Sequence, residues 1–458
     1  MRSYILFVLI LAAMVGLPAC TKKDTSNHKV MLTYTRWGNP AEMESARELI
    51  AQFEKENPDI EVRVDVVGWE QYWQKIMTST ATDVAQDVWL MSSAYVEEYA
   101  AAGHIMDLVP LLQADPTFKE DDYFPSAFDP YTFVSFGDEL LRVPFKLPAV
   151  ESDPQTRPRL YAFTRDFNCS FLYYNRDHFD AIGLAYPTED WTWDDLVEAA
   201  KKLTIDFNND GVIDQWGYAG LTYGHFAGAI GAESLDLKAR KSLYQSPLML
   251  KAVTFCQDLI YKYKVHPQPR IQIDETDSFV TGKASMMIAG VWSVRSFSRS
   301  HSRWDVAPIP VDIKGRKRKV AGSGVAHSIF ARTKHPKEAW RLVKFLSGDS
   351  GQRALARSGT SVPVLKSAAL SDDFLAGFDR PSKNGRSIIV RTLENASSPE
   401  QFAKGYLEYT RKITDTLDGV WRNTRTPEDA CRMIDKHVDE ILAQRYAAEK
   451  PAAERASQ

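Results

Sequence analysis

The chain has 458 residues, a formal net charge of −4, and a composition of 44% hydrophobic and 25% charged residues. This length exceeds one ordinary hydrophobic core, so it predicts two domains of roughly 150–200 residues each. The composition is that of a globular protein, and the mixed charge gives no reason to expect a nucleic-acid partner.

The first twenty residues have the pattern of a secretory signal. An apolar run from residue 4 to residue 17 follows Arg2 and is too short for a comfortable membrane span. The run ends in Leu17-Pro18-Ala19-Cys20, which resembles a bacterial lipobox and would make Cys20 the lipidated first residue of the mature chain. The alternative is an ordinary signal peptide in which this cysteine is accidental. We expect a signal at residues 1–20 and a short polar tether at residues 21–29.

Three further cysteines, Cys169, Cys256 and Cys431, remain after the signal. An odd number leaves at least one unpaired, so a disulfide framework is not expected in this exported chain. Their spacing is not that of a metal site.

The first part of the chain predicts a strand, a helix and a second strand in succession. Val30–Tyr34 is a strand candidate, and Ile60–Val66 alternates apolar and polar residues as a half-buried strand does. Apolar residues recur at helical spacing between them, and this order predicts a parallel pair with a right-handed crossover. A third short strand is expected at Val88–Met91.

Polar and aromatic residues follow each of these strands. Arg36 and Trp37 fall in the loop expected after the first strand, and the aromatic segment Gly68–Trp73 is expected to be the loop after the second. Ser92–Tyr95 opens a helix after the third strand, where free backbone N–H groups and hydroxyls can bind a polar ligand. Because ligands bind beyond the carboxyl ends of strands in open α/β sheets, these segments predict one wall of a cleft.

The stretch Phe279–Trp292 combines a strand, a glycine and a tryptophan. Ser285–Ala289 has the pattern of a buried strand, Gly290 permits close backbone approach, and Trp292 follows. Trp292 is therefore either a ring that stacks on a ligand or an ordinary core residue.

Two surface segments allow a functional interpretation. Asp206, Asn208 and Asp210 occupy positions one, three and five of a calcium-loop pattern, but position twelve is Gly217 and not a bidentate glutamate. We interpret this segment as a tight surface loop, with calcium binding as the alternative. The proline-rich segment Glu151–Arg159 predicts an inserted surface loop, which is either inert or a lid over one end of the cleft.

Several short motifs follow one another along nearly the whole mature chain, and none is specific by itself. They are Phe53–Pro58, Gly68–Ile76, Leu172–Asn175, Thr192–Leu196, Gly282–Trp292, Gly322–Ser328 and His335–Leu346. In this order they resemble the extracellular solute-binding proteins of family 1, which are sugar-type receptors of ABC importers.

This resemblance implies an α/β fold of two lobes, the periplasmic-binding-protein type II fold, with mixed sheets flanked by helices and a hinge of crossing strands. The implied organisation is lobe 1 at residues 30–144 and 311–353, a crossing segment with an inserted loop at 145–165, lobe 2 at 166–310 and 354–446, and a disordered tail at 447–458.

The resemblance also implies a function. The chain would be an extracytoplasmic, lipid-anchored and monomeric receptor that captures a mono- or oligosaccharide by hinge closure and delivers it to an ABC permease. No enzyme activity, cofactor or metal is expected. The implied ligand contacts are Arg36, Trp37, Trp69, Tyr72, Ser93, Asn168, Tyr218, Trp292, Ser293, Gly322, Arg357 and Ser361.

Other functions remain open at this stage. A receptor for a glycerol-phosphate-type or other small anionic solute would grip its ligand with Arg36, Arg165 and Arg357. An exported glycosidase would need two acids that face each other across the cleft, although the sequence carries none of the common catalytic motifs. A lipoprotein that signals the ligand to a receptor is a further alternative.

Overall fold

The computed structural model describes residues 29–447, apart from residues 39, 83, 125–126, 137–138, 222, 270–274, 320, 360, 377–380, 395–397 and 400–402. Its strands are β1 (Val30–Trp37), β2 (Ile60–Val67), β3 (Val88–Ser92), β4 (Thr132–Phe136), β5 (Glu139–Arg142), β6 (Arg159–Leu160), β7 (Phe163–Asn168), β8 (Ser170–Asn175), β9 (Leu235–Asp236), β10 (Lys241–Ser242), β11 (Met286–Gly290), β12 (Trp304–Ala307), β13 (Ala321–Ile329) and β14 (Ser398–Pro399). Its α-helices are α1 (Pro40–Glu56), α2 (Trp69–Ala81), α3 (Val96–Ala101), α4 (Val109–Gln113), α5 (Arg176–Ala181), α6 (Trp193–Leu203), α7 (Tyr223–Ile230), α8 (Pro247–Tyr261), α9 (Glu275–Val280), α10 (Val294–Phe297), α11 (Pro336–Ser347), α12 (Asp349–Ser358), α13 (Lys366–Ala369), α14 (Asp372–Leu375), α15 (Lys383–Glu394), α16 (Tyr406–Trp421) and α17 (Pro427–Ala447). Short 3₁₀ helices are η1 (Glu120–Asp122), η3 (Asp129–Tyr131) and η4 (Val291–Ser293).

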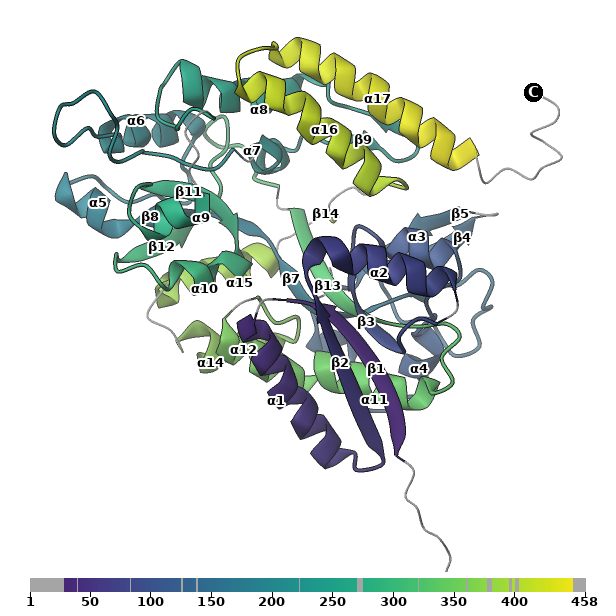
Figure 1. Ribbon diagram of the computed structural model, residues 1–458. Coiled ribbons are helices and arrows are strands. Elements are labelled where there is room, and N and C mark those ends of the chain that lie inside the picture. Colours follow the sequence, from purple (N-terminus) through teal and green to yellow (C-terminus); the bar gives the residue numbers. More distant parts are fainter. Residues whose placement is uncertain are drawn as a thin grey trace, which may run out of the picture.

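The larger sheet has the strand order β14-β13-β3-β1-β2, with β7 paired to β13. The predicted parallel pairing of the first two strands is confirmed, since β1 runs parallel to β2 from Val30↔Ile60 to Trp37↔Val67. Strand β13 closes the sheet by running antiparallel to β3 and to β7. Helices α1, α2 and α11 pack around this sheet (Figure 1).

The smaller sheet has the strand order β11-β8-β12, and both of its pairings are antiparallel. Alternate residues of β8 point to opposite faces, as a pleated strand requires. Phe171 and Tyr173 belong to the hydrophobic core that also fills the larger sheet, while Leu172 and Tyr174 belong to a second core built with α6, α7, α8, α16 and α17. The two sheets with their cores confirm the expected two-lobe α/β architecture (Figure 1).

The first passage of the chain from the larger to the smaller sheet takes a single residue. Asn168 ends β7 in the larger sheet, Cys169 is buried, and Ser170 begins β8 in the smaller sheet. The chain leaves the smaller sheet after β12 and re-enters the larger one at β13. The two sheets, and therefore the two lobes, are connected by these passages of the chain.

Two local predictions were wrong in a way that matters for the site. Arg36 and Trp37 lie within β1 and not in a loop, because the pairing with β2 continues to the last residue of both strands. The aromatic segment after β2 is not a loop either, since α2 begins directly at Trp69 with Gly68 as its N-cap. Thr192 and Asp195 form a capping box at the start of α6.

The helices of the described part of the chain include none that combines the length and apolar character needed to cross a bilayer.

Candidate functional site

One wall of the candidate site is an aromatic cluster at the carboxyl end of β1 and the start of α2. The ring centroids of Trp37 and Trp69 lie 4.9 Å apart in an edge-to-face arrangement, and those of Trp37 and Tyr72 lie 5.0 Å apart. Tyr72 is fully buried, and its hydroxyl donates to the Leu90 carbonyl at 2.6 Å. Trp69 keeps 48% of its surface exposed. Trp69 is therefore the exposed ring of this wall. It packs edge-to-face against Trp37 and Trp73, and Tyr72 packs against Trp37.

Trp292 belongs to the lobe of the smaller sheet, where it follows the end of β11. A Cβ atom at Gly290 would lie 2.2 Å from the Trp292 Cη2 and Cζ3 atoms, so the indole ring lies directly over the glycine backbone. The ring nevertheless keeps 53% of its surface exposed. Gly290 thus supports one part of the ring and leaves another part open. Ser293, next in the chain, is only partly buried.

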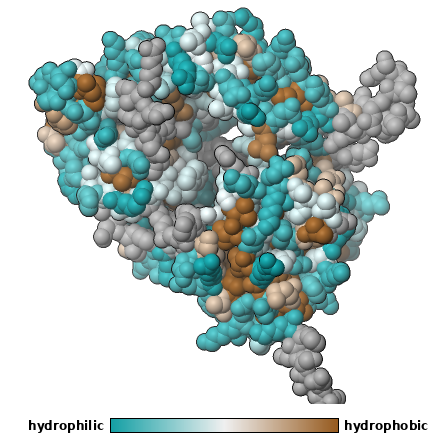
Figure 2. Space-filling view, in the orientation of Figure 1, coloured by the Kyte–Doolittle hydropathy of each residue, from teal (hydrophilic) through white to brown (hydrophobic). Residues whose placement is uncertain are grey.

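A cleft of about 1270 Å³ opens between Trp69 and helix α16. Figure 2 shows this hollow between the part of the surface that carries α16 and the part that carries α2. Tyr409, Ile413 and Leu417 anchor the buried side of α16 in the second core. The exposed side of α16 supplies Leu407, Glu408, Thr410, Arg411, Lys412, Thr414 and Asp415 to the cleft, and α17 supplies Arg445.

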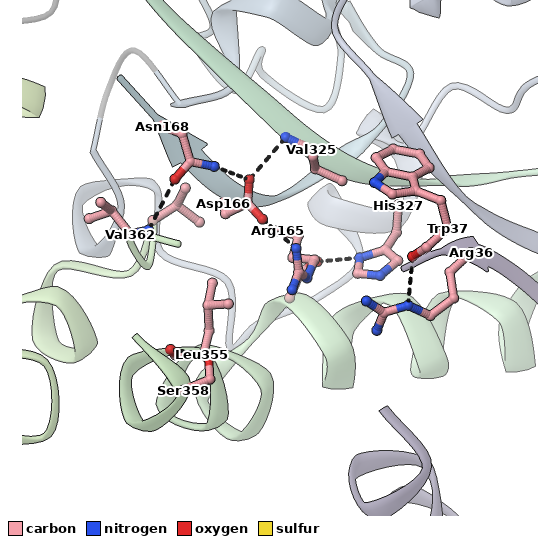
Figure 3. A network of polar contacts seen from close by, with 12 residues as sticks. Arg36, Trp37, Arg165, Asp166, Asn168, Val325, His327, Leu355, Ser358 and Val362 are labelled. Carbon is pink, nitrogen blue, oxygen red and sulfur yellow. Dashed lines mark hydrogen bonds and ion pairs between the residues drawn. The ribbon is translucent and has the colours of Figure 1, made fainter. Parts of the chain in front are cut away.

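A polar network occupies the crossing between the two sheets (Figure 3). Asn168 donates to the Asp166 carboxylate at 2.9 Å and accepts the Val362 backbone N–H at 3.3 Å. Asp166 is fully buried, accepts the Val325 backbone N–H at 3.2 Å and forms an ion pair with Arg165. The Asn168 side chain therefore links the segments that cross between the sheets. A ligand could reach it only if these contacts rearranged.

Two arginines modify the electrostatics beside this network. Burial raises the pKa of Tyr34, and the charges of Arg36 and Arg165 oppose that rise. Burial also holds the pKa of His327 well below its usual value, and both arginines lower it further. Arg36 is only 6% exposed, and its Nε donates to the Trp37 carbonyl at 3.2 Å. The first wall thus has a positive charge behind its aromatic face.

The remaining predicted contacts lie in different environments. Ser93 is buried next to β13, and its hydroxyl has no hydrogen-bond partner among the described residues. Gly322 lies against the Phe167 ring and pairs with Pro399 of β14, so its backbone is used in the sheet. Ser361 is 6% exposed at the crossing. Arg357 lies on the exposed end of α12, 3.7 Å from the Asp373 carboxylate.

Tyr218 lies away from the cleft. It is fully buried in the second core, where its ring packs near Phe226 and His266. In this conformation it offers no face to a ligand between the lobes. The sequence signal, an aromatic residue beside a glycine, does not distinguish a core ring from a ligand platform.

The calcium candidates form a hydrogen-bonded turn. The Asp206 carboxylate accepts the Gly211 N–H at 2.8 Å, and Asn208 accepts the Asp210 N–H at 2.9 Å. Within the described residues, no group of three or more histidines, cysteines and acids has the geometry to hold a metal ion. Cys20, the predicted lipidation site, lies outside the described residues, as does the tail from residue 448.

The inserted segment Glu151–Arg159 is attached to the first lobe. Arg157 is buried and forms an ion pair with Asp107 at 2.7 Å, while Arg159 donates to the Pro154 carbonyl at 3.0 Å. The Arg157–Asp107 ion pair holds the C-terminal part of the segment on the lobe that carries Asp107, and the Arg159 bond closes a turn within the segment.

The sequence analysis missed the contribution of α16 to the cleft. Its polar residues have the spacing of any solvent-facing helix side, which gives no reason to select them. Only the position of α16 opposite Trp69 identifies this side as a wall.

Comparison with known proteins agrees with this geometry. The sequence profile of the family described as bacterial extracellular solute-binding protein matches residues 37–353. The chain is 21% identical to the maltodextrin-binding protein MdxE of Bacillus subtilis, with 93% of this chain and 95% of that protein covered. It is also 21% identical to the galactooligosaccharide-binding protein of Bacillus subtilis, covering 79% of this chain and 80% of the relative.

The fold is similar to that of an ABC substrate-binding protein from Listeria monocytogenes, whose structure was solved in complex with cycloalternan. The TM-score is 0.76 at 21% sequence identity, and the superposition covers 91% of this chain and 99% of the other.

Proposed function

This chain belongs to the bacterial extracellular solute-binding protein family, and from that membership we propose that it captures a carbohydrate between its two lobes and delivers it to the permease of an ABC importer. The family consists of binding proteins of transporters and not of enzymes, and membership implies an extracytoplasmic location. Relatives named for galactooligosaccharide and maltodextrin binding support a sugar as the ligand.

The observation that carries the proposal is a half-exposed tryptophan on each lobe. Trp69 and Trp292 expose 48% and 53% of their surfaces, although large aromatic residues are usually highly buried. Aromatic faces stack on the apolar faces of sugar rings, and polar side chains nearby can hydrogen-bond the hydroxyls. A sugar that contacts both walls binds fully only when the lobes approach each other, so ligand shifts the hinge equilibrium toward a closed form that the permease recognises.

The size of the cleft favours an oligosaccharide. Its volume of about 1270 Å³ exceeds the roughly 300–1,000 Å³ of most small-molecule pockets. The lining supplies hydroxyls from Thr410 and Thr414 and a cation from Arg411, which has no ion pair among the described residues. A ligand of several sugar rings would fill more of this volume than a single ring would.

A small anion is a less favoured ligand, because the arginines that would bind it are already close to carboxylates. Arg165 already pairs with the buried Asp166, and Arg357 lies near Asp373 on an exposed helix end. Binding phosphate there would have to compete with these carboxylates.

A glycosidase is also less favoured. A hydrolase of this kind needs two carboxyl groups on opposite sides of the bond to be cleaved. Among the described residues that line the cleft, the acids Glu408 and Asp415 both lie on α16, and Glu408 pairs with Arg445 at 2.8 Å. We therefore propose binding without catalysis.

Thermal melting of the chain without residues 1–20 tests the proposal. The panel would contain maltotriose, maltopentaose, stachyose, glucose and glycerol 3-phosphate. A ligand that binds only the folded state at a hundredfold excess over its dissociation constant adds roughly 2.7 kcal/mol, which moves the melting temperature by several degrees. We expect a shift with an oligosaccharide, which Trp69→Ala and Trp292→Ala reduce.

Phe207→Ala is the matched control, because Phe207 is also an exposed aromatic residue but lies in the surface loop before Asp210. It should leave the shift unchanged. A shift with glycerol 3-phosphate alone would replace the sugar by an anion as the ligand.

We also propose that the mature chain is a monomer held on the membrane by lipid at Cys20, as the lipobox-like sequence suggests. In cells fed radiolabelled palmitate, wild-type protein should carry label and sediment with membranes, whereas Cys20→Ser should do neither. Label on both proteins would contradict the assignment of Cys20.

A further inference from the structure

A serine at the crossing between the lobes lies beside the Trp292 ring. Ser170 is the first residue of β8, and its partner across the antiparallel pair is Gly290. Side chains of such partners point to the same face, with Cβ atoms about 4.5–5.5 Å apart. The Trp292 ring occupies the place where a Gly290 side chain would be. The Ser170 side chain and the Trp292 ring are therefore neighbours on one face of the smaller sheet.

Ser170 is paired with a histidine of α7. The Ser170 Oγ atom lies 2.7 Å from the His225 Nε2 atom. The other ring nitrogen, Nδ1, is buried and has no hydrogen-bond partner among the described residues. Burial lowers the pKa of His225 to about 4, so the ring is neutral near pH 7 and carries one proton.

The position of that proton decides what Ser170 can do. A proton on Nδ1 would leave a buried N–H donor without an acceptor, which is rarely found in proteins, whereas an unused acceptor is better tolerated. We therefore assign the proton to Nε2, which donates to Ser170 Oγ. The hydroxyl proton of Ser170 is then free to be donated elsewhere. Ser170 is only partly buried, so a ligand can reach it.

We propose that Ser170, oriented by His225, donates a hydrogen bond to a hydroxyl of the sugar ring that stacks on Trp292. This inference rests on the proposed carbohydrate binding and adds a specificity-determining pair to it. Ser170 contacts the ligand, and His225 is a positioning residue that acts through Ser170.

The same strand pair provides a matched control at its other end. The Ser285 Oγ atom lies 2.9 Å from His178 Nδ1, beyond Asn175 at the end of β8. Ser285 is fully buried, so this second serine–histidine pair is closed to a ligand. Both pairs join a helix to the smaller sheet, but only the pair at Ser170 borders the Trp292 ring.

The test is calorimetric titration of the chain without residues 1–20 with maltotriose and with stachyose. We expect Ser170→Ala and His225→Phe each to weaken binding about tenfold, the effect of a lost hydrogen bond of roughly 1.4 kcal/mol. The double variant should be no weaker than either single variant, because both remove the same donor. Ser285→Ala should lower the melting temperature and leave the affinity within a factor of two.

Equal affinities of the wild type and Ser170→Ala, with the wild type binding a sugar, would overturn the inference while leaving the proposed function intact. Additive losses in the double variant would overturn the positioning role of His225. If the wild type bound neither sugar while glycerol 3-phosphate bound, the proposed function would fail and the inference with it. A Ser170→Ala melting temperature close to that of the wild type separates a lost ligand contact from a damaged fold.

Discussion

At the scale of single residues, Gly290 decides how Trp292 is presented. A methyl group at Gly290 would lie 2.2 Å from the ring, so Gly290→Ala must displace the indole, although the backbone angles suit alanine. We expect sugar affinity to fall at least about tenfold, which corresponds to ~1.4 kcal/mol. The matched control is Gly228→Ala in α7, where a methyl group meets no atom within 4 Å; it should keep the affinity and raise stability by about 0.4–1 kcal/mol. Titration calorimetry and melting of both variants check this, and equal affinities would contradict the stated role of Gly290.

At the scale of elements, α16 connects the two lobes. The Tyr406 ring packs against both hydrophobic cores and lies 5.8 Å from the ring of Tyr95, which in turn stacks on Trp73 at 3.8 Å in the first wall. We expect Tyr406→Ala to favour open forms, since it removes a contact made only when the lobes are close. Small-angle scattering should then give a larger radius of gyration without sugar and the wild-type radius at saturating sugar. Tyr261→Ala, which removes a phenol bonded to the Trp421 carbonyl within the second lobe, should lower stability without changing the radius. A sugar-free radius equal to that of the wild type would show that Tyr406 does not hold the lobes together.

At the scale of the whole molecule, buried histidines make stability depend on pH. Burial lowers the pKa of His266 to about 4 and that of His327 well below its usual value. Between about pH 6.5 and pH 4, the unfolded chain, in which histidine titrates near 6.5, therefore binds protons that the folded protein does not bind. Stability is complete above about pH 6.5 and is lost as the pH falls toward 4, by up to roughly 1.4 kcal/mol per pH unit for each such histidine. Urea unfolding at pH 7, 6 and 5 should show this decline, and His266→Gln should make it shallower. Equal unfolding free energies at pH 7 and pH 5 would contradict the argument.

Several features could be predicted from the sequence because they depend on neighbouring residues. The strand, helix and strand at the start of the chain follow from local periodicity, and the capping box at Thr192 is complete within four residues. Trp292 was predicted to follow a buried strand, and it does so. The ordered motifs were enough to identify the family.

The tertiary structure decided what depends on distant pairing. Trp37 belongs to β1 only because β2 extends as far as β1 does, and Trp69 faces α16 across more than 300 residues of intervening chain. Tyr72 and Tyr218 have the same local pattern as exposed site residues, and only packing shows that they are buried. The pair of Ser170 and His225 forms because β8 and α7 meet on one face of a sheet. Local sequence determines which elements form, whereas the cleft is created by contacts between elements that local sequence does not specify.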